Sequence, residues 1–185
     1  MEGVVGQGII VGILATGVRL ATPFLLAALG EMFAQRSGVY NLGIEGVMLM
    51  GAFLGFFVTW RLGNPYLGLL AALSIGAVMG LLMAVVSITF KAEQGISGIG
   101  LYMFGWGLSG LLFRLYVGAI TTIPGLRPLK IPVLSDIPYV GTIVFSHNWI
   151  VYLAYILVPV TWFILFKTPW GLKVRAVGTT PEAAD

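Results

Sequence analysis

Cysteine is absent from the 185-residue sequence, and the only histidine is His147. Without cysteine the chain can build neither a disulfide framework nor a thiolate metal site, and one histidine does not form a metal centre alone. The G-x-x-x-x-G-K-[ST] pattern of a phosphate-binding loop is also missing. We therefore expect no metal, cofactor or ATP site in this chain, and redox chemistry is not expected of it.

Charged residues are scarce as well. Asp, Glu, Lys and Arg together make up 9% of the residues, and the formal net charge is +3. The basic residues are too few and too scattered for a nucleic-acid-binding surface. Hydrophobic residues reach 58%, and the mean hydropathy is +1.00. A water-soluble domain of this length could not expose so much apolar surface, so the sequence indicates a membrane protein.

Five apolar segments have about the 20-residue length that a membrane-spanning helix needs. They are residues 7–29, 42–60, 66–90, 95–117 and 149–166. The third runs 25 residues without a charge, which is enough to cross about 30 Å of hydrocarbon. We therefore predict an all-α, polytopic membrane helix bundle with about five transmembrane segments.

Three of these segments carry a charged residue at membrane depth, and the last contains a proline. The charged residues are Arg19, Glu45 and Arg114, and the proline is Pro159. Such residues favour a packed bundle over separate anchors, because they must face protein or water. Glycines four residues apart would allow close helix packing. They occur at Gly8 and Gly12, at Gly51 and Gly55, and at Gly76 and Gly80.

The segment 118–148 joins the fourth and fifth predicted helices. Its prolines exclude a long helix; they are Pro124, Pro128, Pro132 and Pro138. Apolar pieces such as "IPVL" and "IPYVGTIVF" favour a folded surface loop, and a solvated connector is the alternative. The chain then divides into a transmembrane bundle, residues 1–166, and a closing stretch, residues 167–185.

Counting Lys and Arg in the predicted loops tests the orientation in the membrane. If the closing stretch is cytoplasmic, the inner loops carry Arg36, Lys91, Lys167, Lys173 and Arg175. The outer loops then carry Arg61, Arg127 and Lys130. Because basic residues concentrate on the inner side, we expect a cytoplasmic C-terminal tail and place the segment 118–148 on the outer face.

The closing stretch "GLKVRAVGTTPEAAD" is basic and ends on a helix start signal. Thr180 can cap free backbone N–H groups, Pro181 fits the first helical position, and Glu182 complements the positive end of the helix dipole. Because only three residues follow, we expect a truncated chain or a reading frame that continues beyond Asp185. A basic segment followed by a short helix suits docking to a soluble partner.

Two regions resemble a known family. "GEMFAQRSGVYNLGIEGVMLMGAF" and "TPWGLKVRAVGTTPEAAD" are similar to signature regions of the permease subunits of ABC importers for simple sugars and nucleosides, in the superfamily of branched-chain amino acid and ribose permeases. The resemblance covers the whole chain in order. It implies a transport subunit rather than an enzyme, in the plasma membrane of a prokaryote. Members usually carry further spans after the coupling loop.

The resemblance also implies partners. They are an ABC ATPase subunit that binds ATP and Mg, a second permease subunit, an extracytoplasmic solute-binding lipoprotein and membrane lipid. The closing stretch resembles the element that couples the permease to the ATPase. The matching residues are Gly171, Arg175, Ala176, Gly178, Pro181, Glu182 and Ala183. Arg175 either pairs with an acidic groove or serves as a basic residue that flanks the membrane.

The piece "SGVYNLGIEG" should line or support the translocation path. If a helix begins near Leu42, Asn41 and Glu45 share one face, and Glu45 lies about 5 Å inside the apolar segment. Glu45 then either contacts the solute or holds a gate, or it pairs internally with Arg19 or Arg114 as a buried charge partner.

Glycines and aromatic residues complete this candidate path. Gly38, Gly43 and Gly46 would allow one broken helix, with "EMFAQR" partly within the membrane, and a broken helix presents backbone groups to a polar solute. Tyr102 and Trp106 could stack on a nucleobase or sugar ring, or they could serve packing. The candidate path residues are Asn41, Gly43, Glu45, Tyr102 and Trp106.

The sequence favours the transmembrane subunit of an ATP-driven importer for nucleosides or simple sugars, which moves solute by alternating access. The alternative is a secondary transporter or channel that uses Glu45 and the arginines as proton or ion groups. A membrane-embedded enzyme would need convergent His, Asp, Glu or Ser–Lys groups, and the apolar segments are poor in them.

Overall fold

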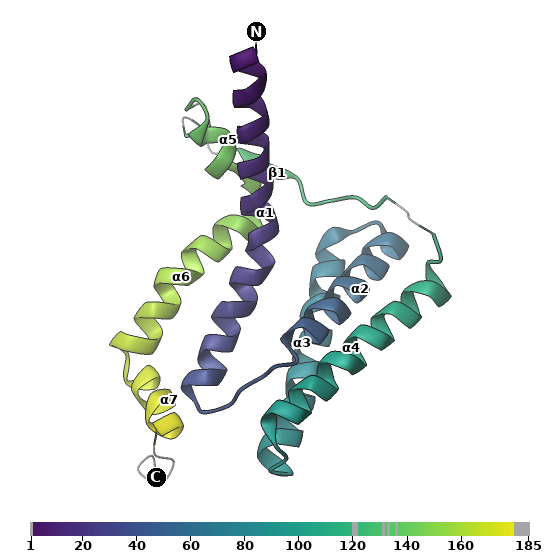
Figure 1. Ribbon diagram of the computed structural model, residues 1–185, viewed down its shortest axis with the longest axis vertical. Helices are drawn as coiled ribbons and strands as arrows, with labels where there is room; N and C mark the ends of the chain where they lie inside the picture. Colours follow the sequence, from purple (N-terminus) through teal and green to yellow (C-terminus); the bar gives the residue numbers. More distant parts are fainter. Residues whose placement is uncertain (1, 120–121, 131, 133, 136, 180–185) are drawn as a thin grey trace. The chain divides into compact units, whose positions relative to one another are not determined.

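A computed structural model describes residues 2–119, 122–130, 132, 134–135 and 137–179, with side chains from residue 8 onward. The long helices in this part are α1 (Glu2–Arg36), α2 (Ile44–Leu62), α3 (Pro65–Ala84), α4 (Gln94–Tyr116) and α6 (Trp149–Lys167) (Figure 1). The shorter elements are the π-helical turn η1 (Val85–Thr89), the helices α5 (Val140–Val144) and α7 (Pro169–Thr179), and the strands β1 (Pro128–Lys130) and β2 (Ser146–Asn148).

Five of the helical stretches are long and apolar enough to cross a membrane. They are Gly8–Arg36, Ile44–Leu62, Pro65–Thr89, Gln94–Tyr116 and Trp149–Lys167. Each overlaps most of one of the five apolar segments of the sequence, so the predicted all-α polytopic membrane bundle is confirmed. The chain is a multi-pass membrane protein.

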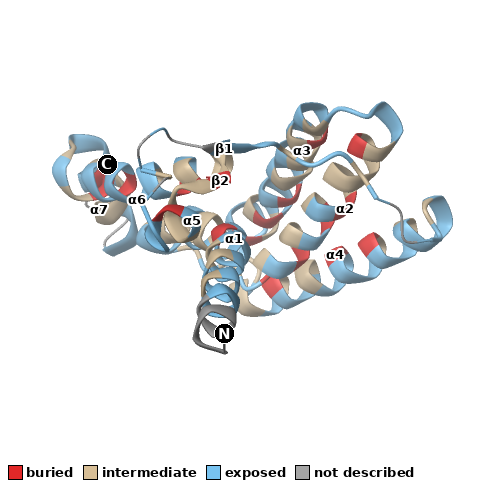
Figure 2. Ribbon diagram, turned by 90° about the horizontal axis from the view of Figure 1, so that it is seen from above, coloured by how far each residue is buried: buried red, intermediate tan, exposed pale blue. Residues whose placement is uncertain are grey.

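The chain forms two compact units. Unit 1 comprises Met1–Gly30 and Leu126–Lys173, and unit 2 comprises Glu31–Gly125 and Val174–Asp185. The proposed division of the chain at residue 166 stays a prediction. Within unit 2, α2, α3 and α4 lie side by side and turn their buried residues toward one another (Figure 2).

A tight turn joins α2 to α3. Gly63 adopts a left-handed conformation (φ 67°), and its N–H donates to the Thr59 carbonyl at 2.8 Å. Asn64 then accepts a hydrogen bond from the Tyr66 N–H at 2.9 Å, and Pro65 occupies the first helical position. Glycine after a helix and Asn–Pro before the next are common end and start signals, so this hairpin follows from local sequence.

A second turn joins α3 to α4. After η1 the chain passes through Lys91 in a left-handed conformation (φ 53°). The Glu93 carboxylate caps α4 by accepting from the N–H groups of Ile96 at 2.5 Å and Gly95 at 3.0 Å. These two backbone hydrogen bonds, the Ile96 bond first, lower the pKa of Glu93 below its ordinary value, because they favour the charged form.

In unit 1, two pieces of the segment 118–148 are folded, residues 128–130 and 140–148. Strands β1 and β2 pair antiparallel with Leu129 opposite His147. The His147 ring is buried, and its Nε2 lies 2.8 Å from the Ile143 carbonyl oxygen in α5. The expected folded loop is therefore present. Helix α6 follows directly and continues through Pro159.

The predicted glycine contacts are found for one pair only. A Cβ built on Gly55 would lie 3.3 Å from both the Ala72 Cβ and the Gly68 carbonyl oxygen, so α2 and α3 approach closely there. Around the other two pairs, Gly8 with Gly12 and Gly76 with Gly80, no described neighbour lies within 4 Å of a Cβ position. The described residues therefore show no packing contact at these two pairs, because four-residue spacing defines a smooth helix face without saying which face meets a neighbour.

Candidate functional site

Helices α2 and α4 touch through glycines at one end. A Cβ built on Gly43 would lie 2.7 Å from the Gly98 carbonyl oxygen, and one on Gly46 would lie 2.7 Å from the Tyr102 Cα. A Cβ on Gly105 would overlap the backbone of Gly46. We call Gly43, Gly46, Gly98 and Gly105 the glycine seam, where backbone packs directly on backbone.

The other end of the same helix pair is held by aromatic side chains. The rings of Phe57 and Tyr116 lie 5.8 Å apart, and those of Phe56 and Phe113 lie 6.0 Å apart. The Arg61 guanidinium sits 4.9 Å from the Trp60 ring centre and 5.5 Å from that of Phe57. We call Phe53, Phe56, Phe57, Trp60, Phe113 and Tyr116 the aromatic end. The first part of α2 meets the first part of α4 at the seam, and the last part of α2 meets the last part of α4 at the aromatic end. The two helices therefore run in the same direction.

The start of α2 differs from the prediction. The Asn41 side chain accepts a hydrogen bond from the Gly43 N–H at 2.9 Å, and the helix begins only at Ile44. Asn41 therefore precedes the helix, and the expected shared face with Glu45 was wrong, because asparagine closes a turn on its own backbone. Glu45 lies exposed in the first helical turn, where its charge complements the helix dipole.

The predicted broken helix is not found in the part of the chain that the structure describes. The chain forms two separate helices instead, α1 and α2, with a connection between them. "EMFAQR" forms the regular end of α1, which continues to Arg36. The connection that follows, residues 37–43, is the α1–α2 linker. Gly38 lies in this linker with φ 86°, a conformation that suits glycine. Gly43 is buried in the seam, against Gly98 and Leu101 of α4, and is therefore not open to a solute.

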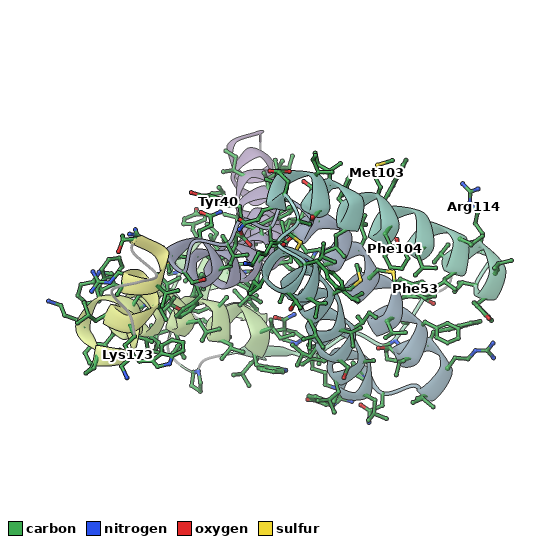
Figure 3. All side chains as sticks on the ribbon, turned by 90° about the horizontal axis from the view of Figure 1, so that it is seen from below. Tyr40, Phe53, Met103, Phe104, Arg114 and Lys173 are labelled. Atoms are coloured by element: carbon green, nitrogen blue, oxygen red, sulfur yellow. The ribbon has the colours of Figure 1, made fainter. Side chains whose placement is uncertain are left out.

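The arginines that were expected to be buried are exposed. Arg114 lies in the last turn of α4, and its side chain points away from the helices (Figure 3). Glu45 starts α2 beside the seam, whereas the rise along α4 from Gly98 to Arg114 is about 24 Å. The predicted Glu45–Arg114 pair is therefore wrong, because the two residues lie at opposite ends of the helix pair. An arginine near a helix end can instead extend toward the membrane interface. Arg19 is exposed on α1, and its pairing with Glu45 stays a prediction.

Tyr102 and Trp106 stack on each other along α4. Their ring centres are 6.5 Å apart and the planes differ by 5°. Trp106 is 62% exposed, whereas Tyr102 is half-buried and its backbone packs on Gly46. The pair therefore presents an aromatic surface directly beside the glycine seam.

A shallow apolar hollow of unit 2 lies between α3 with η1 and α4. It is lined by Leu82, Met83, Val86, Ser97, Gly100, Leu101 and Phe104. None of the candidate path residues lines it. Asn41, Gly43 and Glu45 gather at the start of α2, and Tyr102 and Trp106 lie further along α4. Whether they line a translocation path stays a prediction.

The closing stretch is helical from an earlier residue than expected. Helix α7 begins at Pro169, and the Thr168 hydroxyl accepts from the Gly171 N–H at 3.2 Å. The segment expected to be a basic loop is therefore a helix, because "TP" at 168–169 is a cap and start signal of the same kind as "TP" at 180–181. That later signal lies outside the described residues. Pro181, Glu182 and Ala183 of the coupling set lie outside them as well.

Two glycines of the coupling set face inward from α7. Gly171 packs on the backbone of Ile164 and Leu165. Gly178 packs on the backbone of the turn that ends α1: a Cβ there would overlap the Arg36 carbonyl oxygen and lie 3.0 Å from the Gly38 nitrogen. Arg175 and Ala176 are half-buried.

Another face of α7 is exposed. It carries Trp170, Lys173 and Val177, spaced so that they follow one side of the helix (Figure 3 labels Lys173). Trp170 is 59% and Val177 42% exposed. The coupling residues predicted from the sequence thus include the glycines by which α7 packs, whereas the prediction did not identify this exposed face.

Gln94 is another residue that sequence reasoning missed. Its side-chain oxygen accepts a hydrogen bond from the Tyr40 N–H at 2.8 Å, across 54 residues of sequence. Glu31 similarly accepts from the Asn41 N–H at 3.0 Å. The only sequence signal for Gln94 is its place directly after the helix cap Glu93, and this signal does not reveal a partner so distant in sequence.

Comparison with known proteins finds a family of transport permeases and relatives named as ABC transporter permeases. Residues 13–185 match the family described as "Branched-chain amino acid transport system / permease component". The chain is 43% identical over 175 residues to the guanosine ABC transporter permease protein NupQ of Bacillus subtilis, an alignment that covers 89% of this chain and 55% of that protein. It is 40% identical over 176 residues to the putative glucose ABC transporter permease protein TsgC13 of Haloferax volcanii, covering 94% of this chain and 54% of that protein.

A third relative is the nucleoside ABC transporter permease protein NupC of Lactococcus lactis, 32% identical over 182 residues, with 94% of this chain and 57% of that protein covered. The chain spans about half the length of the curated relatives it matches. No solved structure matches it. Because the match extends over residues 13–185, the chain belongs to the family of permease components of branched-chain amino acid transport systems.

Proposed function

We propose that this chain is part of the transmembrane subunit of an ATP-driven ABC importer for nucleosides or simple sugars. The observation that carries the proposal is the form of α7. This helix follows the last described span. Within unit 1 its Gly171 packs on the backbone of α6, within unit 2 its Gly178 packs on the turn after α1, and Trp170, Lys173 and Val177 are exposed. A short, firmly seated helix with one exposed face suits docking to a soluble subunit.

The partner that docks there is an ATPase subunit, which binds ATP with Mg and hydrolyses the ATP. The sequence of this chain has no phosphate-binding loop, so hydrolysis belongs to the partner. A second permease subunit and an extracytoplasmic solute-binding lipoprotein complete the importer. The family membership and the names of the relatives support this assembly.

The closing stretch is cytoplasmic in this proposal. Contacts in unit 2 bring together three segments with basic residues: the end of α1 with Arg36, the turn before α4 with Lys91, and α7 with Arg175. Their clustering supports the orientation that the loop charges predict. These 185 residues contain no cysteine, so single cysteines are placed at Lys173 and at Lys130 in a complete permease from which any other cysteine has been removed. An impermeant thiol reagent added to intact cells should label the cysteine at 130 and spare the one at 173.

The solute is a nucleoside or a simple sugar. Relatives named for guanosine, for nucleosides and for glucose support this class. The stacked pair of Tyr102 and Trp106 offers a flat apolar surface of the kind on which a base or sugar ring can lie. Uptake of guanosine and of glucose, each competed by the other, would separate the two.

Co-purification tests the docking. The complete permease is co-expressed with the ATPase, and the wild type is compared with the variant Lys173→Glu plus Val177→Asp. The matched control is Lys130→Glu, which makes one of the same charge changes in β1. We expect the α7 variant to insert normally but to lose most of the ATPase, while the control retains it. Unchanged association of the α7 variant would contradict the proposal and favour a secondary transporter.

A further inference from the structure

Three neighbours within unit 2 hold the α1–α2 linker: the end of α1, helix α7 and the Gln94 side chain. Its first residues close α1: the Gly38 N–H donates to the Gln35 carbonyl at 3.1 Å and the Val39 N–H to the Ala34 carbonyl at 3.0 Å. This is the hydrogen-bond pattern of a Schellman motif, with Gly38 in the left-handed position. The motif gives the linker a fixed shape where it leaves α1.

Helix α7 rests on this motif backbone to backbone. A Cβ on Gly38 would lie 3.4 Å from the Gly178 Cα, and a Cβ on Gly178 would overlap the Arg36 carbonyl oxygen. The two glycines are required for different reasons, Gly38 for its positive φ and Gly178 for space. A contact without side chains has no rotamers to absorb movement, so a displacement of α7 is passed directly to the linker.

Gln94 holds the linker from the other side. Its Oε1 accepts from the Tyr40 N–H at 2.8 Å, and its Nε2 donates to the Gly38 carbonyl at 3.5 Å. One amide side chain thus binds the N–H and C=O of two linker residues, as a neighbouring strand would. Because Gln94 is the first residue of α4, these bonds tie the linker to that helix.

The linker then enters the glycine seam. The Asn41 N–H donates to Glu31, the Asn41 side chain closes the turn onto Gly43, and Gly43 packs on Gly98. A continuous set of short contacts therefore runs from α7 through Gly38 and Tyr40 to the starts of both α2 and α4. The candidate path residues Asn41 and Glu45 lie at its far end.

We propose that Gln94 and Gly178 are the positioning residues of a coupling clamp, which passes movement of α7 through the α1–α2 linker to the glycine seam. The clamp rests on the proposed importer function and names the route by which the ATPase would act on α2 and α4. Gln94 contacts neither ATPase nor solute in this role; it acts through the linker.

The clamp predicts a loss of coupling without a loss of assembly. The complete permease, its ATPase and its binding lipoprotein are reconstituted, and guanosine uptake is measured together with ATP hydrolysis. Gln94→Leu removes both linker bonds and should lower the solute moved per ATP by about fivefold or more, with normal insertion and normal ATPase association. Gln94→Glu keeps the acceptor for the Tyr40 N–H and should restore most of the ratio.

Ser97→Ala is the matched control. Ser97 lies one turn further along α4, and its hydroxyl donates to the Glu93 carbonyl within that turn, at 2.7 Å. This variant should keep the wild-type ratio. If Gln94→Leu keeps it too, or if its insertion or ATPase association falls below that of Ser97→Ala, the clamp is overturned.

A double-mutant cycle provides an independent reading. Gly178→Ala should separate α7 from the linker, so adding Gln94→Leu to it should lower the ratio little further. Losses that simply multiply would show independent sites and overturn the clamp. Absence of ATP-driven guanosine and glucose uptake in the wild type, with the assembled complex present, would instead contradict the proposed function itself.

Discussion

The two ends of the α2–α4 pair are built on opposite principles. At the glycine seam the backbones touch, because four positions have no side chain to hold them apart. At the aromatic end the two helices meet through large rings, and the Arg61 guanidinium lies over two rings of α2. Backbone contacts fix helix position closely, whereas ring contacts tolerate small displacements. The rigid end is also the end that carries the α1–α2 linker and the first turn of α4, where coupling is proposed.

Adding a single methyl group to the seam should have the largest effect. In Gly105→Ala the new Cβ would overlap the Gly46 backbone, and overpacking against backbone should cost about 3 kcal/mol of stability. Thermal unfolding of the purified protein in detergent measures the loss. The control is Gly76→Ala on α3, where the Cβ position is open and the better helix propensity of alanine should be neutral or stabilise by up to about 1 kcal/mol. Equal behaviour of the two variants would remove the distinction between the two ends.

Truncating a ring at the aromatic end should cost less. Phe57 contacts the rings of Phe53, Trp60 and Tyr116 at centroid distances of 5.8, 6.2 and 5.8 Å. Phe57→Leu loses these ring contacts but keeps an apolar side chain, so we expect a loss of about 1–2 kcal/mol. Phe90→Leu is the control, since Phe90 is 73% exposed. A Phe57→Leu loss as large as that of Gly105→Ala would show that both ends are equally rigid.

The helix caps at the two ends differ in charge. Asn64 caps α3 at the aromatic end with a neutral side chain. Asn64→Ala removes the acceptor for the Tyr66 N–H and should destabilise by about 1 kcal/mol. The midpoint of thermal unfolding should fall by a similar amount at every pH between 4 and about 8. A strongly pH-dependent difference would contradict a neutral cap.

Glu93, the cap of α4 beside the seam, should give the smallest and the only pH-dependent effect of these variants. Because its pKa is lowered in the folded protein, its stabilisation is present above the unfolded pKa and is lost as pH falls through the folded pKa. Glu93→Gln should therefore unfold at a slightly lower temperature than the wild type at pH 7, with the difference vanishing in acid. A difference that grows in acid would have the wrong sign.

Helix positions could be predicted from the sequence better than helix contacts. Apolar length alone located the five spans, because the bilayer imposes that length on any spanning helix. The seam could not be predicted in the same way. Gly43, Gly46, Gly98 and Gly105 are set by which faces meet, whereas the regularly spaced Gly76 and Gly80 have no described neighbour.

The candidate site shows the same limit. Asn41 was placed on a helix because a hydrophobic run begins at Leu42, but its side chain caps the turn to Gly43 instead. The start of α7 at Pro169 is predictable from Thr168–Pro169, which is the same kind of start signal as Thr180–Pro181. Gln94 could not be found from sequence, because its partner Tyr40 is 54 residues away.

ATP-driven uptake by the reconstituted complete permease is the most direct measurement. With the ATPase subunit and the binding lipoprotein present, guanosine or glucose should accumulate only when ATP is supplied on the side of the ATPase, and omission of the ATPase should abolish uptake. Uptake driven by an ion gradient with no ATPase present would contradict an importer subunit and establish a secondary transporter instead.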